Sequence, residues 1–159
     1  TDAVDPEQVE KPRPWDIKQL TRFIVFIGPC SSVFDYTTYV VMLYIFNCWN
    51  VSTPEATVRS ASLFQTGWFV ESLLTQTLII HIIRTNKIPF LQSRSSGPLI
   101  GMSVVIMATG IATPFTPLGH YLGFTALPPL YWPLLALTLL CYVLLTQSVK
   151  MWLLRRRWI

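Results

Sequence analysis

Two carboxylate side chains lie inside long apolar stretches of this 159-residue chain, Asp35 in the first stretch and Glu71 in the second. A charged group within a membrane costs about 2.5 to 3.5 kcal/mol on insertion scales, so it usually faces protein or a watery path. Asp35 follows Arg22 by 13 residues and Glu71 precedes Arg84 by 13 residues. In antiparallel helices both carboxylates would therefore lie at a similar depth, roughly 20 Å from a basic edge. We predict that Glu71 and Asp35 are ion-pathway candidates.

Hydroxyl, amide and small residues accompany both carboxylates at helical spacing. Such oxygen groups suit a hard cation, and Mg²⁺ in particular keeps several waters while using one or two carboxylates. The same residue types also join membrane helices by hydrogen bonds without touching an ion. Both interpretations therefore stay open for the accompanying residues, which are Gly28, Ser31, Ser32, Thr38, Tyr39, Gln65, Gly67, Ser72, Thr75 and Gln76.

The histidines and cysteines form no recognisable metal or catalytic pattern. His81 is expected to be a packing or interfacial residue, and His120 has no Cys, Asp or Glu near it at metal-ligand spacing. Cys30, Cys48 and Cys141 are an odd number without a CxxC motif, so we expect small apolar packing residues. The sequence contains no GxxxxGK[ST], GxSxG or HExxH motif. We therefore expect that the chain alone does not hydrolyse ATP or peptides.

Four apolar stretches must position the two carboxylates. The chain is 52% hydrophobic and 13% charged, whereas soluble domains carry about 25% charged residues. A membrane-spanning helix needs about 20 mostly apolar residues, and residues 23–46, 63–83, 98–115 and 130–154 meet this requirement. We predict an all-α integral membrane bundle of four transmembrane helices over residues 23–159. A polar, proline-containing leader is predicted for residues 1–22.

The basic residues are distributed unevenly over this outline. If all four stretches cross, eleven of the 12 Lys and Arg residues lie on one side and only Arg59 lies on the other. The positive-inside rule then places both termini and the connection around Lys87 in the cytosol. A nucleic-acid-binding protein would gather such charges on one solvated face, but here apolar runs separate them. The predicted partner is the lipid bilayer, and no nucleic-acid binding is expected.

Several runs of residues go beyond hydropathy and resemble a known family. They are KPRPWD at residues 11–16, FIGP at 26–29, LFQTGWFVE at 63–71 and KIPFLQSR at 87–94. These runs are similar to the carboxy-terminal membrane region of bacterial magnesium-translocating P-type ATPases. The resemblance extends from about residue 11 to the end of the chain.

The resemblance implies a multi-pass location in the bacterial inner membrane, with these helices as the last four of ten. It implies that Mg²⁺ is the transported ion and that ATP acts only on missing parts of the parent pump. Those parts, the cytosolic domains and the first six spans, would be the partners of this chain. In related calcium pumps a carboxylate on the second of these four spans helps to bind an ion. This similarity favours Glu71 as a candidate ion ligand.

Two functions remain as hypotheses. In the first, the helices scaffold an ATP-driven magnesium importer and contribute one carboxylate to its ion path. In the second, the chain is a self-contained four-helix membrane channel, carrier or assembly subunit that uses Asp35 and Glu71. A self-contained carrier often contains inverted repeats or paired broken helices, and the sequence shows neither.

Overall fold

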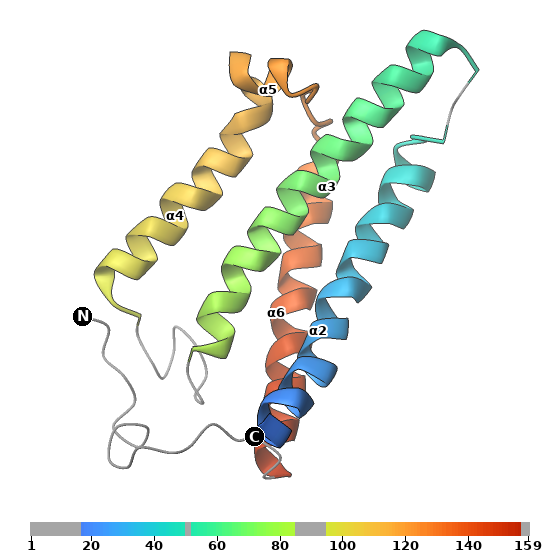
Figure 1. Cartoon of the computed structure of the whole chain (residues 1–159). Helices are drawn as coiled ribbons and strands as arrows, with labels where there is room; N and C mark the ends of the chain where they lie inside the picture. Colours follow the sequence, from blue (N-terminus) through green and yellow to red (C-terminus); the bar gives the residue numbers. More distant parts are fainter. Residues whose placement is uncertain (1–16, 50–51, 85–94, 157–159) are drawn as a thin grey trace.

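The computed structural model describes residues 17–49, 52–84 and 95–156, and in this part of the chain all regular structure is helical (Figure 1). The long helices are α2 (Ile17–Val40), α3 (Pro54–Ile83), α4 (Gly97–Ala112) and α6 (Tyr131–Arg155). The short ones are the π-helical turn η1 (Val41–Ile45), the 3₁₀ turn η2 (Thr113–Phe115) and α5 (Pro117–Tyr121).

Four helical segments are long and apolar enough to cross a membrane. They comprise Thr21–Ile45, Pro54–Ile83, Gly97–Phe115 and Tyr131–Arg155. The predicted all-α class with four transmembrane helices is therefore confirmed. The predicted leader lies outside the described residues as far as residue 16, and residues 17–22 form the first turns of α2.

The second membrane helix begins earlier than its apolar stretch, at Pro54 instead of near residue 63. Thr53 caps it, because its side-chain oxygen accepts a 3.1 Å hydrogen bond from the amide of Ala56. Pro54 suits the first helical position, and Glu55 lies at the positive end of the helix dipole. These capping signals start the helix in polar sequence, where a hydropathy criterion has no signal.

The π-helical turn η1 continues α2 directly and widens its last turn. The amide of Phe46 bonds to the carbonyl of Val41 at 3.3 Å, five residues back, as a π-helix requires. Met42 within this turn is fully buried. Its terminal atoms lie against Gly67, where an added Cβ would come within 2.8 Å of them. Close approach of η1 to α3 therefore depends on a glycine at position 67.

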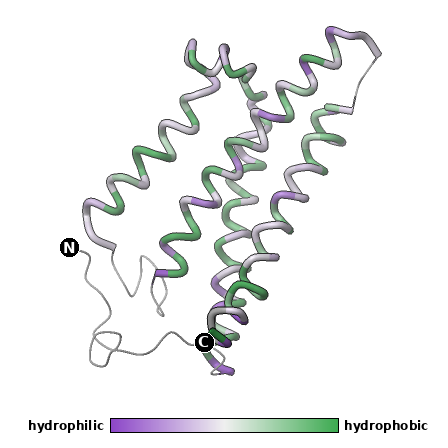
Figure 2. Tube along the Cα trace, in the orientation of Figure 1, coloured by the Kyte–Doolittle hydropathy of each residue, from purple (hydrophilic) through white to green (hydrophobic). Residues whose placement is uncertain are grey.

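The helix α3 is the centre of the bundle, since it contacts α2, α4 and α6 (Figure 1). The helices α2 and α6 also pack on each other, whereas α4 packs on α3. One buried apolar cluster joins η1, α3 and the start of α6 through Met42, Leu74 and Tyr131. A second cluster lies nearer the other end of the bundle, around Phe34, Ile82 and Tyr142. Figure 2 shows that hydrophilic positions recur along α3, whereas α4 is hydrophobic over most of its length.

Candidate functional site

Glu71 lies on the buried side of α3 and its side chain has no solvent exposure. Neither of its carboxylate oxygens has a hydrogen-bond partner among the described residues. Most buried polar side chains in proteins do have such a partner, because an unsatisfied buried group is costly. Burial of the Glu71 carboxylate thus costs free energy of folding, and binding of a ligand is one physical reason for a carboxylate at this position.

Asp35 lies on the neighbouring helix α2 and is only partly buried. Its Oδ1 atom accepts a 3.2 Å hydrogen bond from the hydroxyl of Ser72. The Asp35 carboxylate is also close enough to Glu71 to interact with it electrostatically. The structure therefore brings together the two residues that the sequence predicted, one from α2 and one from α3. Two like charges in a medium of low dielectric constant repel each other, and a cation near both would relieve that repulsion.

Two tyrosines of α6 complete the surroundings of Glu71. Tyr131 is 2% exposed and Tyr142 is fully buried, and both are near enough to Glu71 for an electrostatic interaction. The Tyr131 hydroxyl donates a 2.6 Å hydrogen bond to the carbonyl of Gly67, and the Tyr142 hydroxyl lies 3.3 Å from Ser31 Oγ. Neither tyrosine was predicted from the sequence as part of this site. Their spacing in the sequence was a usable signal, because residues 11 apart, such as these two tyrosines, lie on the same face of a helix after three turns.

The threonines of α3 have a different arrangement. The hydroxyls of Thr66, Thr75 and Thr77 each donate to a backbone carbonyl four residues earlier. Thr66 also accepts a 3.0 Å hydrogen bond from the amide of Thr125, which ties the connection before α6 to α3. The bonds of Thr75 and Thr77 therefore lie within α3 and join no helices, whereas Thr66 links α3 to another segment of the chain.

The two carboxylates do not form a complete metal cage by themselves. Within the described residues, no group of three or more His, Cys, Asp or Glu side chains is placed to hold a metal ion. Mg²⁺ characteristically keeps several waters and takes one or two carboxylates. The arrangement can therefore attract and partly coordinate a hydrated cation.

His81 is buried and bridges α3 to α4. Its Nδ1 lies 3.1 Å from Ser95 Oγ and its Nε2 lies 2.8 Å from Ser103 Oγ. Ser103 donates its own hydroxyl proton to the carbonyl of Leu99 at 2.9 Å. Ser103 must then accept from His81, which assigns the ring proton to Nε2. His81 has the packing role that its position predicted, whereas His120 is exposed on α5.

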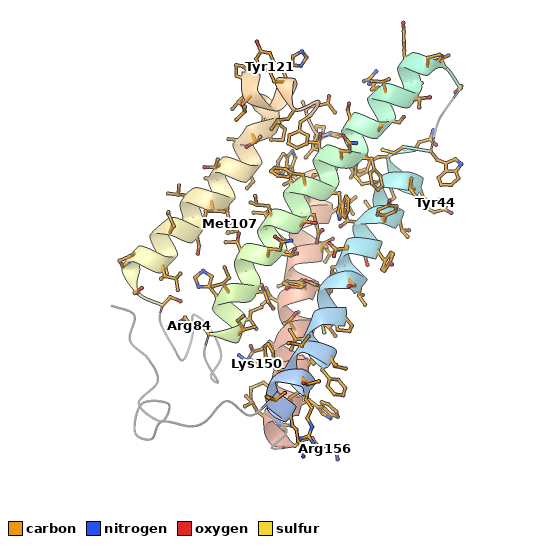
Figure 3. The ribbon with its side chains drawn as sticks, in the orientation of Figure 1. Tyr44, Arg84, Met107, Tyr121, Lys150 and Arg156 are labelled. Carbon is orange, nitrogen blue, oxygen red and sulfur yellow. The ribbon has the colours of Figure 1, made fainter. Side chains whose placement is uncertain are left out.

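Lys150 near the end of α6 is 2% exposed, although its charge predicted a side chain in contact with water at the membrane boundary. Its ammonium donates a 2.9 Å hydrogen bond to the carbonyl of Ile82, in the last turn of α3 (Figure 3). The carbonyls of a last helical turn lack partners within the helix and form the negative end of its dipole. Lys150 thus joins α6 to the end of α3 with a favourable charge.

The three cysteines are free thiols with unequal surroundings. Cys30 is buried and donates a 3.3 Å hydrogen bond to the carbonyl of Phe26, whereas Cys141 is exposed on α6. Cys48 is partly buried after η1, outside the membrane-spanning segments, and burial raises the pKa of its thiol. Of the three, Cys30 has the buried packing position that was expected.

Residues 2–152 match the family model described as "Cation transporting ATPase, C-terminus". The chain belongs to this family. This cation-transporting ATPase segment is 46% identical over 155 residues to "Magnesium-transporting ATPase, P-type 1" of Salmonella typhimurium. It is 49% identical over 149 residues to the protein of the same name from Escherichia coli. The alignments cover 98% and 94% of the chain but 16% of each relative, so the chain spans about a sixth of their length.

The family predicted from short runs of residues is thereby confirmed. In the cation-transporting ATPase segment, the run 63–71 forms the part of α3 that carries Gly67 and Glu71. The run 26–29 lies within α2, which continues as a helix through Pro29. The runs 11–16 and 87–94 lie outside the described residues.

Proposed function

We propose that the chain is the carboxy-terminal membrane region of an ATP-driven magnesium importer in a bacterial inner membrane. In this proposal α2, α3 and α6 scaffold the ion path, and Glu71 supplies a carboxylate to Mg²⁺ as the transported substrate. The family and the names of the relatives support the kind of pump. They also favour this function over a self-contained channel or carrier.

The observation that carries the proposal is the fully buried Glu71 carboxyl group, which has no partner of opposite charge among the described residues and interacts there with a second carboxyl group, that of Asp35. A divalent cation would provide the countercharge that the described residues do not provide. Asp35 adds a second negative charge next to Glu71 and is oriented by Ser72. A hard cation prefers such oxygen ligands, and its retained waters can contact the oxygens that it does not bind directly.

The remaining activities belong to parts of the pump outside this chain. The sequence has no phosphate-cradling loop, so ATP would be bound and hydrolysed by cytosolic domains of the parent protein. Those domains, the other transmembrane helices and the lipid bilayer are the proposed partners. The excess of basic residues supports cytosolic termini.

The substitution Glu71→Gln in the full-length pump tests this function, because it removes the charge and keeps the size. We expect weaker Mg²⁺-stimulated ATP turnover, with more Mg²⁺ needed for half-maximal activity, at normal expression and membrane insertion. Glu55→Gln is the matched control, since Glu55 is an exposed carboxylate at the start of the same helix. Unchanged Mg²⁺ dependence in a well-folded Glu71→Gln pump would falsify the ligand role.

A further inference from the structure

The connection from α4 to α6, residues 113–130, contains η2 and α5 but no Asp, Glu, Lys or Arg. It lies at the end of the bundle remote from Lys150, where Figure 3 shows Tyr121. The chain passes from α2 to α3 at the same end (Figure 1), and there Glu55 and Arg59 are exposed. Soluble domains carry about 25% charged residues. The connection around α5 therefore has the composition of a segment that does not face water alone.

One side of α5 is apolar and exposed. Tyr121 and Leu122 come three and four residues after Leu118, so the three side chains lie on one side of the helix. Each is more than half exposed, and Tyr121 is 89% exposed. The exposed His120 lies about 200° around the helix from Leu118, on the opposite side. We call Leu118, Tyr121 and Leu122 the α5 patch.

The backbone around the α5 patch has hydrogen-bond partners within the protein. After α5, the amide of Gly123 donates to the carbonyl of His120 at 3.1 Å. The amide of Phe124 donates to the carbonyl of Gly119 at 2.8 Å, which completes a Schellman motif with Gly123 at a φ of 77°. Before α5, the Thr116 hydroxyl accepts a 3.2 Å bond from the amide of Gly119. Such internal pairing is what allows irregular backbone to lie next to hydrocarbon.

The segment that carries the α5 patch is fastened to the bundle on both sides. Behind it, the rings of Phe124 and Phe69 are 4.8 Å apart, next to the Thr66 bond described above. In front of it, Phe115 of η2 stacks on Trp132 of α6 with ring centroids 6.2 Å apart. The α5 patch therefore has a defined position relative to α3 and α6.

The α5 patch continues the apolar surface of the membrane helices. Exposed side chains of α4 include Val105 and, in its last turn, Ile111, and Leu130 is exposed just before α6. Both helices are long and apolar enough to cross a membrane, so such side chains face lipid tails. The α5 patch follows at the level where these helices leave the hydrocarbon.

We infer that the α5 patch inserts into the membrane interface at the end of the bundle remote from Lys150, so that its partner is lipid. An interfacial helix buries its apolar side about 5–10 Å into the boundary between headgroups and acyl chains. Tyr121 suits this level, because its ring can contact acyl chains while its hydroxyl reaches the headgroups. Through the contacts of Phe124 and Phe115, the inserted patch holds α3 and α6 at a fixed depth in the bilayer. This inference rests on the membrane-spanning fold and is independent of the proposed function.

Spin labels on single cysteines can test this contact in the full-length protein, in a cysteine-free background and in vesicles of phosphatidylethanolamine and phosphatidylglycerol. Leu118→Cys probes the α5 patch, and His120→Cys places the same label on the opposite side of the same helical turn. Collision rates are measured with lipid-dissolved oxygen and with a water-soluble nickel chelate. We expect the ratio of oxygen to chelate collisions to be several-fold higher at position 118 than at position 120.

Equal ratios at the two positions would overturn the inference, because the label at position 118 would then be as exposed to water as that at position 120. Low collision rates with both reagents at position 118 would also contradict it, since protein and not lipid would then cover the α5 patch. Leu122→Cys provides the same measurement if Leu118→Cys does not fold.

Discussion

The hydroxyl of Tyr131 bonds to the carbonyl of Gly67 at 2.6 Å, one helical turn before Glu71. Gly67 allows this approach, because an added Cβ would lie 3.3 Å from the Tyr131 ring and closer still to Met42. The contact holds the start of α6 against the middle of α3. This packing contact on α3 thereby fixes the position of Glu71, the candidate ion ligand, along the bundle.

Tyr131→Phe should destabilise the helix bundle. The substitution removes one buried hydrogen bond, so we expect a loss of about 0.5 to 1.5 kcal/mol in the free energy of unfolding. Denaturant-induced or thermal unfolding in detergent measures this change. Tyr121→Phe is the matched control, because Tyr121 is 89% exposed on α5. Equal stability of both variants would show that the Tyr131 bond contributes nothing.

Asp35→Asn should weaken the Mg²⁺ response of the full-length pump less than Glu71→Gln does. Asp35 is only partly buried and already accepts a hydrogen bond from Ser72, whereas Glu71 has no such partner among the described residues. Mg²⁺ titrations of ATP turnover provide the comparison. A larger shift for Asp35→Asn would make Asp35 the principal carboxylate and contradict the proposed ranking.

Lys150→Met should weaken the contact between α6 and the end of α3. It leaves the Ile82 carbonyl without its ammonium donor, and such a loss typically costs on the order of 1 to 3 kcal/mol. Thermal stability of the purified protein reports the effect. Arg155→Met removes a charge from the exposed last turn of α6 and is the control. The assignment fails if the two substitutions change stability equally.

Impermeant thiol reagents should label a cysteine at position 87 only from the cytosolic side and a cysteine at position 59 only from outside. This expectation follows from the eleven basic residues placed on one side and Arg59 on the other. The experiment uses the full-length pump in a cysteine-free background and intact spheroplasts. Labelling of position 87 from outside would reverse the proposed orientation.

Hydropathy was sufficient to predict the four membrane helices, because bilayer thickness sets the length of apolar sequence that a helix needs. The spacing of Asp35 and Glu71 from basic residues also predicted a similar depth for the two carboxylates, but not that they lie next to each other. Hydropathy could not predict the hydrogen-bond partners around the two carboxylates. Ser72 meets Asp35, and Tyr142 meets Ser31, only when each helix has a particular rotation about its own axis. Lys150 illustrates the same limit: its charge predicts an aqueous boundary, but the carbonyl that it contacts belongs to a helix 68 residues away.

The one-sided attachment of α4 has a consequence for how the bundle opens. Among the described long helices, α4 packs mainly on α3, through the His81 bridge and through Gly110, which lies against Leu73. Lipid tails are as apolar as most of its exposed side chains, so the hydrophobic effect adds little to the association within a membrane. Slow amide exchange should therefore persist in α2, α3 and α6 after α4 has begun to exchange, with α4 behaving as a separate cooperative unit of local unfolding.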